Sequence, residues 1–426
     1  MRIWHLDREY DRFIATVASA REERKTGVRS IVEGIRGEVL KRGEQAVIDY
    51  TRRFDGWAGD YSLKVSKAEL AEAASSVSRQ DRSVLKGMIE NVVRFHRSQK
   101  QRRRTYRKNG LTVTEEAVPV EKALVYVPGG KAPYPSSLVM CVVPAKIAGV
   151  HEVYATTPTH DGRINPYIAA AALMLDVNDL YRASGAQAIY GFSFGTGDLP
   201  KVDMIVGPGN AYVEEAKRDV YGRVGIDMLA GPSELVVLAT ENFSPKILAW
   251  DLFSQAEHDE MAMVGLFSPS LEALYDLLKS MERLVSQNKR REIVEASLNT
   301  SGFLVHYTRL EDAIAAIDRI APEHLEVLGD EKAAEKIRYS GITYVGPYTC
   351  VAMGDYYIGT NHVLPTGAAG RFSSGLSVER FTKRRVLVKI DRSFLRQYGE
   401  NAARLAEIEG FYAHAEAIRA RKELPE

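Results

Sequence analysis

From residue 121 onward, short segments of strand-favouring residues alternate with amphipathic segments. This alternation predicts strand–helix–strand units, in which helices cover both faces of parallel sheets. Strands are expected at residues 123–127, 152–156, 204–206, 235–239, 263–267, 302–306, 342–345 and 386–390. Helices are expected between several of them, at residues 136–148, 166–175, 211–221 and 245–257. The predicted fold class is therefore α/β.

Both ends of the chain are predicted to be helical. Residues 22–50 and 67–97 combine good helix formers with apolar residues at helical spacing. Residues 394–421 are helical and charged, and they offer too little apolar surface for a core, so we interpret them as a C-terminal arm. Basic residues crowd residues 97–108, which predicts a solvated helix end and turn. The alternative for this cluster is contact with RNA phosphates.

Composition excludes several classes of protein. The net charge is +1, so no nucleic-acid partner is expected through bulk charge. The longest apolar run, residues 138–150, is too short to cross a bilayer, and the first residues do not resemble a signal peptide. Cys141 and Cys350 are the only cysteines and lie far apart in sequence, which excludes a disulfide framework and a thiolate zinc site. We therefore expect a cytoplasmic protein with no membrane partner, whose metal ligands would be His, Asp, Glu or amide groups.

Two glycine-rich turns precede predicted helices, although no G-x-G-x-x-G follows a predicted strand. They are residues 126–130 and 207–210, and Asn210 is a good N-cap for the helix that follows. Backbone N–H groups at such a helix start bind phosphate well. A tight turn with no ligand is the more frequent reason for this pattern. Tyr126, expected to be exposed, and the amide of Gln187 favour the nucleotide interpretation.

Polar residues also occur where the pattern requires apolar ones. Gln255 and His258 lie three residues apart on the inward stripe of the helix expected at residues 245–257. Such a pair can converge on one metal ion, or it can be a hydrogen-bonded pair in the core. Glu323 and His324 are an adjacent acid and imidazole that could move two protons in one site if the backbone turns at Pro322.

Two further segments carry candidate site residues. The long glycine-punctuated loop of residues 354–367 contains Asp355 and His362, and long ordered loops are disproportionately functional. In the C-terminal arm, Glu409 and His414 are well apart in angle on a helix, and the simplest interpretation of His414 is a solvated surface residue.

Taken together, these segments resemble histidinol dehydrogenase from about residue 28 to residue 421. The resemblance rests on blocks whose order and spacing are highly specific. They are YVPGGKAPYPSS at 126–137, SGAQAI at 184–189, KVDMIVGPGNAYVEEAKR at 201–218, GRVGIDMLAGPSE at 222–234, DLFSQAEHD at 251–259, APEHLEV at 321–327, GTNHVLPTG at 359–367, RFSSGLSV at 371–378 and EGFYAHAEAIR at 409–419.

The resemblance implies roles for individual residues. One Zn2+ per site would be held by Gln255, His258, Asp355 and His414. Proton transfer would fall to Glu323 and His324. The substrate contacts would be Ser136, Ser233, Gln255, His258, His324, Asp355, His362, Glu409 and His414. The NAD+ contacts would be Tyr126, Gln187 and Asn210. The resemblance also implies an intertwined homodimer with shared active sites, each taking Glu323, His324, Glu409 and His414 from the neighbouring chain.

The implied activity is the four-electron oxidation of L-histidinol, via L-histidinal, to L-histidine with NAD+, the last steps of histidine biosynthesis. Two incomplete Rossmann-like parallel-sheet domains are expected. Residues 1–125 and 234–377 would form the first, on the substrate and zinc side, residues 126–233 the second, on the NAD side, and residues 378–426 the intersubunit arm. An alternative is a dehydrogenase of the same superfamily for another small alcohol or diol. Without the resemblance, the residues suggest a zinc-dependent hydrolase.

Residues 97–108, 111–119 and 190–192 look less like the family than the rest of the chain. Residues 97–108 and 111–119 carry none of the matched site residues, and we expect them to affect the surface or the pocket rim. Tyr190 and Phe192 are bulkier than expected, which bears on the details of the NAD pocket.

Overall fold

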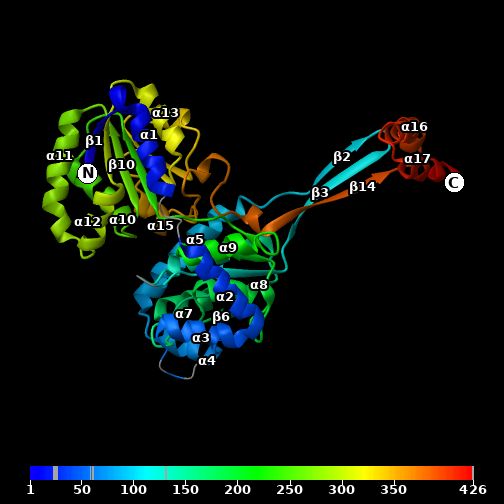
Figure 1. The fold of residues 1–426 in the computed structure, drawn as a ribbon, viewed down its shortest axis with the longest axis horizontal. Coiled ribbons are helices and arrows are strands. Elements are labelled where there is room, and N and C mark those ends of the chain that lie inside the picture. Colours follow the sequence, from blue (N-terminus) through cyan, green and yellow to red (C-terminus); the bar gives the residue numbers. More distant parts are fainter. Residues whose placement is uncertain (23–26, 58, 60–61, 130–131, 425–426) are drawn as a thin grey trace.

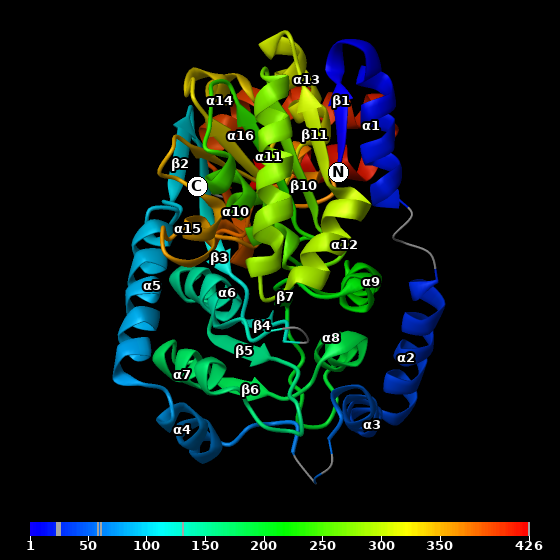
Figure 2. The ribbon, with the colours of Figure 1, turned by 90° about the vertical axis from the view of Figure 1, so that its left-hand side faces the viewer.

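The protein consists of two α/β bodies and a long projecting arm (Figure 1). The computed structural model describes residues 1–22, 27–57, 59, 62–129 and 132–424. Within these ranges no helix combines the length and the apolar character that crossing a bilayer requires. One body is built on a six-stranded sheet and the other on a five-stranded sheet, while the arm contains a three-stranded sheet. Figure 2 shows the two bodies one above the other.

The six-stranded sheet has the order β1-β11-β10-β9-β12-β13, and all its strand pairs are parallel. Its strands are β1 (Arg2–His5), β9 (Glu234–Ala239), β10 (Met263–Ser268), β11 (Phe303–His306), β12 (His324–Leu328) and β13 (Ile342–Val345). One face is covered by α1 (Leu6–Glu22), α13 (Leu310–Ile320) and α14 (Lys332–Lys336). The other is covered by α10 (Pro245–Ala256), α11 (Leu271–Leu284), α12 (Arg291–Ser301) and α15 (Val351–Tyr356). Every residue of β9 and β10 is buried, as expected for central parallel strands.

The five-stranded sheet has the order β6-β5-β4-β7-β8 and is also parallel. Its strands are β4 (Lys122–Tyr126), β5 (Glu152–Thr156), β6 (Asp179–Tyr181), β7 (Met204–Val206) and β8 (Gly225–Ile226). One face packs against α4 (Lys67–Ser75), α5 (Arg79–Arg97), α6 (Pro135–Ala148) and α7 (Pro166–Met174). The other packs against α2 (Val28–Arg42), α3 (Glu44–Asp55), α8 (Gly185–Phe194) and α9 (Ala211–Val220).

The α/β class with parallel sheets is confirmed, and seven of the eight predicted strands occur with ends shifted by at most one residue. The packing of the N-terminal helices differs from the predicted division of the chain. Only β1 and α1 join the six-stranded sheet, whereas α2 to α5 pack on the five-stranded sheet. An amphipathic stripe shows that a helix buries one face, but it does not show which sheet covers that face. The exact domain boundaries stay a prediction.

The arm is an antiparallel sheet of β2 (Arg104–Lys108), β3 (Leu111–Pro119) and β14 (Thr382–Ile390), in the order β14-β3-β2. Helices α16 (Arg392–Ile408) and α17 (Tyr412–Arg419) lie at its far end (Figure 1). A helix end and turn were predicted for the basic cluster at residues 97–108. This prediction is wrong for residues 104–108, which form strand β2. Asn109 and Gly110, with φ of 45° and 84°, form a two-residue hairpin turn that pairs β2 with β3. Short 3-10 helices lie at Val285–Gln287, Ala369–Arg371, Val378–Phe381 and Ala420–Glu423.

Gly265 provides a test of the packing of the six-stranded sheet. A Cβ at this position in β10 would overlap the ring of Phe303, which also contacts the rings of Phe13 and Phe267. We expect Gly265→Ala to lower the free energy of unfolding by about 1–3 kcal/mol through overpacking. Gly34→Ala in α2 is a matched control, since its Cβ would meet open space. It should raise stability by about 0.5–1 kcal/mol. Equal stability of the two variants in denaturant unfolding would contradict this packing.

Candidate active site

A cleft of about 2400 Å³ lies between the two bodies. The five-stranded sheet presents to it the carboxyl ends of its strands, as is usual in α/β folds. The six-stranded sheet presents the amino ends of β9 and β12. The cleft is lined by most of the residues expected to form the site: Tyr126, Ser136, Gln187, Asn210, Ser233, Gln255, His258, Glu323, His324, Asp355 and His362.

Two of the expected site residues lie elsewhere. Glu409 ends α16 and His414 lies in α17, both in the helices at the far end of the arm (Figure 1). By contrast, Glu323 and His324 lie in the same cleft as Gln255 and Asp355 of their own chain. The expectation that Glu323 and His324 come from a neighbouring chain is therefore wrong, because β12 is an inner strand of the six-stranded sheet.

The acid–imidazole pair is brought into the cleft by a turn before β12. Ala321 adopts a left-handed φ of 45°, so the backbone does turn next to Pro322, as the sequence suggested. The His324 Nδ1 lies 3.0 Å from the backbone carbonyl oxygen of Glu234, and the Glu323 carboxylate accepts a hydrogen bond of 2.9 Å from the Glu234 backbone N–H. Both functional groups are thus held by a single residue of β9.

The other ring nitrogen of His324 faces acidic surroundings. Its Nε2 is buried without a hydrogen-bond partner in the described part of the chain and lies 3.7 Å from an oxygen of Asp355. Burial acts to lower the pKa of His324, but the carboxylates of Glu323 and Asp355 outweigh burial and raise this pKa well above its usual value. A cationic group that pairs with Asp355 would therefore free Nε2 to accept a proton.

Gln255, His258 and Asp355 form the cluster of candidate metal ligands. Gln255, at the end of α10, is fully buried, and its Nε2 donates to an Asp355 oxygen at 3.4 Å. Asp355 lies in α15. Burial raises its pKa, but His324, His362 and His258 outweigh burial and lower it below its usual value. His362 is oriented by two contacts, from Nδ1 to the Asp355 carbonyl oxygen at 2.9 Å and from Nε2 to Ser137 Oγ at 3.2 Å. The donors are all nitrogen and oxygen, which suits zinc.

A single chain supplies only part of that ligand set. Among the residues that the structure describes, no group of three His, Cys, Asp or Glu side chains could hold a metal ion. Of the expected ligands of these residue types, only His258 and Asp355 lie in the cleft, beside the amide of Gln255. The fourth expected ligand, His414, lies on the arm.

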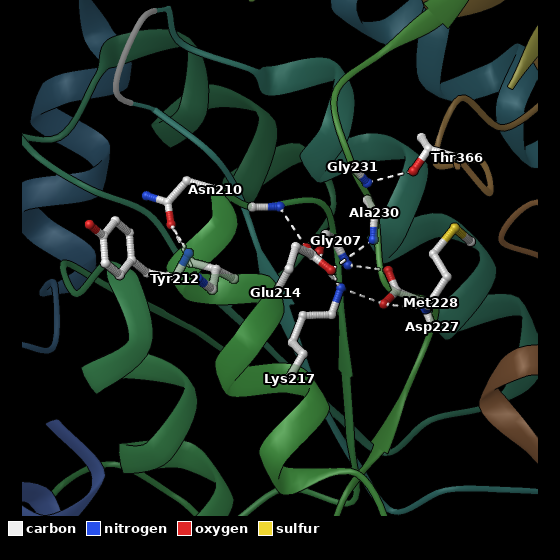
Figure 3. A network of polar contacts seen from close by, with 12 residues as sticks. Gly207, Asn210, Tyr212, Glu214, Lys217, Asp227, Met228, Ala230, Gly231 and Thr366 are labelled. Carbon is white, nitrogen blue, oxygen red and sulfur yellow. Dashed lines mark hydrogen bonds and ion pairs between the residues drawn. The ribbon is translucent and has the colours of Figure 1, made fainter. Parts of the chain in front are cut away.

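The glycine turn before α9 is held from within and is not a free phosphate cradle (Figure 3). The Gly207 N–H donates to Asp227 at 2.7 Å, and the Gly209 N–H donates to Glu214 at 3.1 Å. The Asn210 side chain caps the helix by accepting from the N–H groups of Tyr212 and Val213. The side chains of the same chain therefore occupy donors that a phosphate would use, and the tight-turn interpretation is the better one.

Lys217 is a buried charge beside the cleft residue Glu214 that sequence reasoning missed. Its side chain is fully buried, and its Nζ lies 2.8 Å from Asp227, 3.3 Å from Glu214 and 3.0 Å from the Gly207 carbonyl oxygen (Figure 3). Burial opposes its charge, but the two carboxylates outweigh burial and raise the pKa of Lys217. Its position beside the apolar stripe of α9 was the available signal, because an inward lysine requires a buried counter-charge.

The rest of the expected NAD side is buried. Tyr126 was expected to be exposed and is not. Its Oη accepts from the Gly185 N–H at 3.1 Å, and burial raises its pKa. Gln187 is completely buried, and neither atom of its amide has a hydrogen-bond partner in the described part of the chain. Since Gln187 also lines the cleft, its amide is available to a ligand. Part of the first glycine turn, Gly130, lies outside the described residues.

Glu214 makes stability depend on pH. Burial raises the pKa of Glu214 to about 7 from 4.5, despite the charge of Lys217. A raised pKa means that this carboxyl stabilises the fold below pH 4.5, and that this contribution is lost as the pH rises through about 7. We compare the free energy of unfolding of Glu214→Gln with that of the unsubstituted protein. As the pH rises from 4.5 to about 7, this difference should shift in favour of Glu214→Gln by on the order of 3 kcal/mol. Denaturant unfolding of both proteins across this pH range measures the difference. A difference that does not change with pH would contradict the prediction.

Comparison with known proteins places the chain in one family. A family model for histidinol dehydrogenase matches residues 18–422. Histidinol dehydrogenase from Chlorobaculum tepidum is 40% identical over 394 residues, 92% of each chain. The enzyme of that name from Geobacter metallireducens is 40% identical over 422 residues, 97% of this chain and 96% of that one. The crystal structure of histidinol dehydrogenase from Elizabethkingia anophelis has a TM-score of 0.92 and 32% identity, covering 99% of this chain and 98% of that chain. The chain belongs to the histidinol dehydrogenase family.

Proposed function

We propose that this protein oxidises L-histidinol, through L-histidinal, to L-histidine with two molecules of NAD+. The observation that carries the proposal is the single cleft in which an acid–imidazole pair, a carboxylate and an unpartnered amide meet: Glu323 with His324, Asp355 and Gln187. Membership of the family supports the same activity.

His324 suits the first step, which removes the hydroxyl proton while hydride leaves the carbinol carbon for NAD+. Its Nε2 is buried without a hydrogen-bond partner in the described part of the chain, so it can accept this proton once the nearby Asp355 carboxylate is paired with another cation. The hydrogen bond of Nδ1 to the Glu234 carbonyl oxygen keeps the ring orientation fixed. The product of this step is L-histidinal.

Glu323 suits the second step. The carboxylate would take a proton from water, whose oxygen adds to the aldehyde carbon, and a second hydride would then leave for a second NAD+. The carboxylate of L-histidine results. Glu323 is buried, and burial keeps a reactive aldehyde away from bulk water between the two steps. Adjacent residues thus take successive proton-transfer tasks on one carbon atom.

The remaining cleft residues would bind the substrate and the cofactor. Six of them line the same cleft. Ser136, Ser233 and His362 would contact the substrate, and Tyr126, Gln187 and Asn210 would contact NAD+. We propose that Gln255, His258 and Asp355 hold Zn2+ together with His414 from a second copy of the chain. Zinc, when bound, would orient the substrate by binding the nitrogen atoms of the substrate.

The arm supports an intertwined homodimer. Tyr106, Val113 and Val388 are in register on one face of its sheet, and Tyr106 and Val388 are 55% and 65% exposed. A three-stranded sheet with an uncovered apolar face requires a partner surface. The arm also carries Glu409 and His414 away from the cleft of their own chain (Figure 1). We propose that a second copy covers this face and receives both residues in its cleft. The cytoplasmic location stays a prediction.

Stoichiometry tests the proposed activity. We expect purified enzyme with zinc, NAD+ and L-histidinol to form two NADH per L-histidine, measured by absorbance and by amino-acid analysis. NADH with another small alcohol, but none with L-histidinol, would point to a related dehydrogenase. Product without NADH would point to a hydrolase. Either result would overturn the proposal.

Two substitutions test the division of labour. His324→Ala should slow oxidation of histidinol more than oxidation of added histidinal, because only the first reaction removes the alcohol proton. Glu323→Gln should chiefly slow the oxidation of histidinal, because an amide cannot deprotonate water. Each loss should be roughly 100- to 10,000-fold in the affected step. Single-turnover NADH formation from each substrate measures both steps, and the reverse pattern would refute the assignment.

A further inference from the structure

Arg21 connects the last turn of α1 to the chain segments that carry the acid–imidazole pair. Its Nε and Nη2 donate to the two carboxylate oxygens of Glu234 at 2.9 and 2.8 Å, and its Nη1 donates to the Ile320 carbonyl oxygen at 2.9 Å. Its side chain is 14% exposed and that of Glu234 is 1% exposed. Arg21 precedes all the sequence blocks on which the resemblance was based, which begin at residue 126.

Glu234 in turn contacts both proton-transfer residues. Its backbone N–H donates to the Glu323 carboxylate, and its backbone carbonyl oxygen lies within hydrogen-bond distance of His324 Nδ1. Its own carboxylate accepts from the backbone N–H of Glu323 at 3.3 Å and from that of Gly367 at 3.1 Å. Glu234 therefore determines where the two functional groups point, through backbone and side chain together.

Arg21 is the ion-pair partner of the buried Glu234 carboxylate. Burial and the nearby Glu323 carboxylate raise the pKa of Glu234 above its usual value, although Arg21 opposes both. A bidentate guanidinium also fixes the plane of the carboxylate, which a single ammonium group does not do. Without Arg21, Glu234 would take up a proton or turn away, and it would then no longer accept the hydrogen bonds from Glu323 and Gly367.

We propose that Arg21 is a positioning residue, which acts through Glu234 to hold Glu323 and His324 in their reactive orientation. The inference rests on the proposed function, since it assigns these two residues the proton transfers. The contact to the Ile320 carbonyl oxygen fits this role, because Ile320 ends the helix from which the chain turns toward Glu323.

The test uses the full-length enzyme with zinc and compares Arg21→Met and Arg21→Lys with Arg12→Met, an exposed position on the same helix. A small misorientation of reacting groups costs roughly 10- to 100-fold in rate, so we expect kcat of Arg21→Met to fall by that factor for both histidinol and histidinal. The KM values for both substrates and NAD+ should change less than about twofold, since these contacts are unaltered. Arg21→Lys should lie in between, and Arg12→Met should match the unsubstituted enzyme. Zinc content should be equal in all four proteins.

Several outcomes would overturn the inference. They are an unchanged kcat in Arg21→Met, a loss confined to KM, and an equal loss in Arg12→Met. If Arg21→Met does not fold, the kcat and KM of Arg21→Lys decide by the same criteria. Failure of the proposed function is distinguishable, because it would appear in the unsubstituted enzyme as absence of NADH from histidinol, and it would remove the basis of this inference as well.

Discussion

Two buried ion pairs hold the segment through which the chain crosses from the five-stranded to the six-stranded sheet. Asp227 begins this segment and pairs with Lys217, and both side chains are fully buried. Glu234 ends it and pairs with Arg21. Removing one partner of a buried pair costs about 3–5 kcal/mol, because it leaves an uncompensated charge in the interior. The crossing is therefore fixed at both ends, and the relative placement of the two sheets at the cleft depends on it.

The chemistry of the cleft follows from that placement. Asp227 also holds the glycine turn between β7 and α9, while Glu234 also holds the acid–imidazole pair at the start of β12. Ser233 lies between them on the crossing and lines the cleft. The groups that would bind the cofactor and those that would move protons are thus fixed to opposite ends of one short segment. Hydride transfer requires that the donor and the acceptor are held at a fixed distance and orientation.

The sequence predicted many of the parallel strands because buried parallel strands are continuous apolar runs. Among the strands of the described residues, it missed β1, β2, β3, β6, β8 and β12. At β12, Glu323 and His324 directed attention to chemistry, and for β2 and β3 the Asn109-Gly110 turn was a usable hairpin signal. The cleft residues were found through resemblance, whereas Lys217 and Arg21 were not. Their ion-pair partners Asp227 and Glu234 are distant in sequence. The local pattern can mark an inward lysine in α9, but it does not identify the distant partner of either residue. For the same reason, the sheet covered by α2 to α5 was misassigned.

The cleft of one chain holds the acid–imidazole pair, but the arm carries Glu409 and His414 far from it (Figure 1). In the proposed dimer, this division would give each complete site two contributors, one chain for the cleft and another for the end of the arm. Mixing two inactive variants tests most directly whether one site uses residues of two chains. His324→Ala lacks a working cleft and His414→Ala lacks a working arm, so unfolding and refolding them together would create heterodimers with one intact site. We predict recovery of about a quarter of the unsubstituted activity for random pairing in a two-fold symmetric dimer. Heterodimers that form but remain inactive would contradict a site shared between chains.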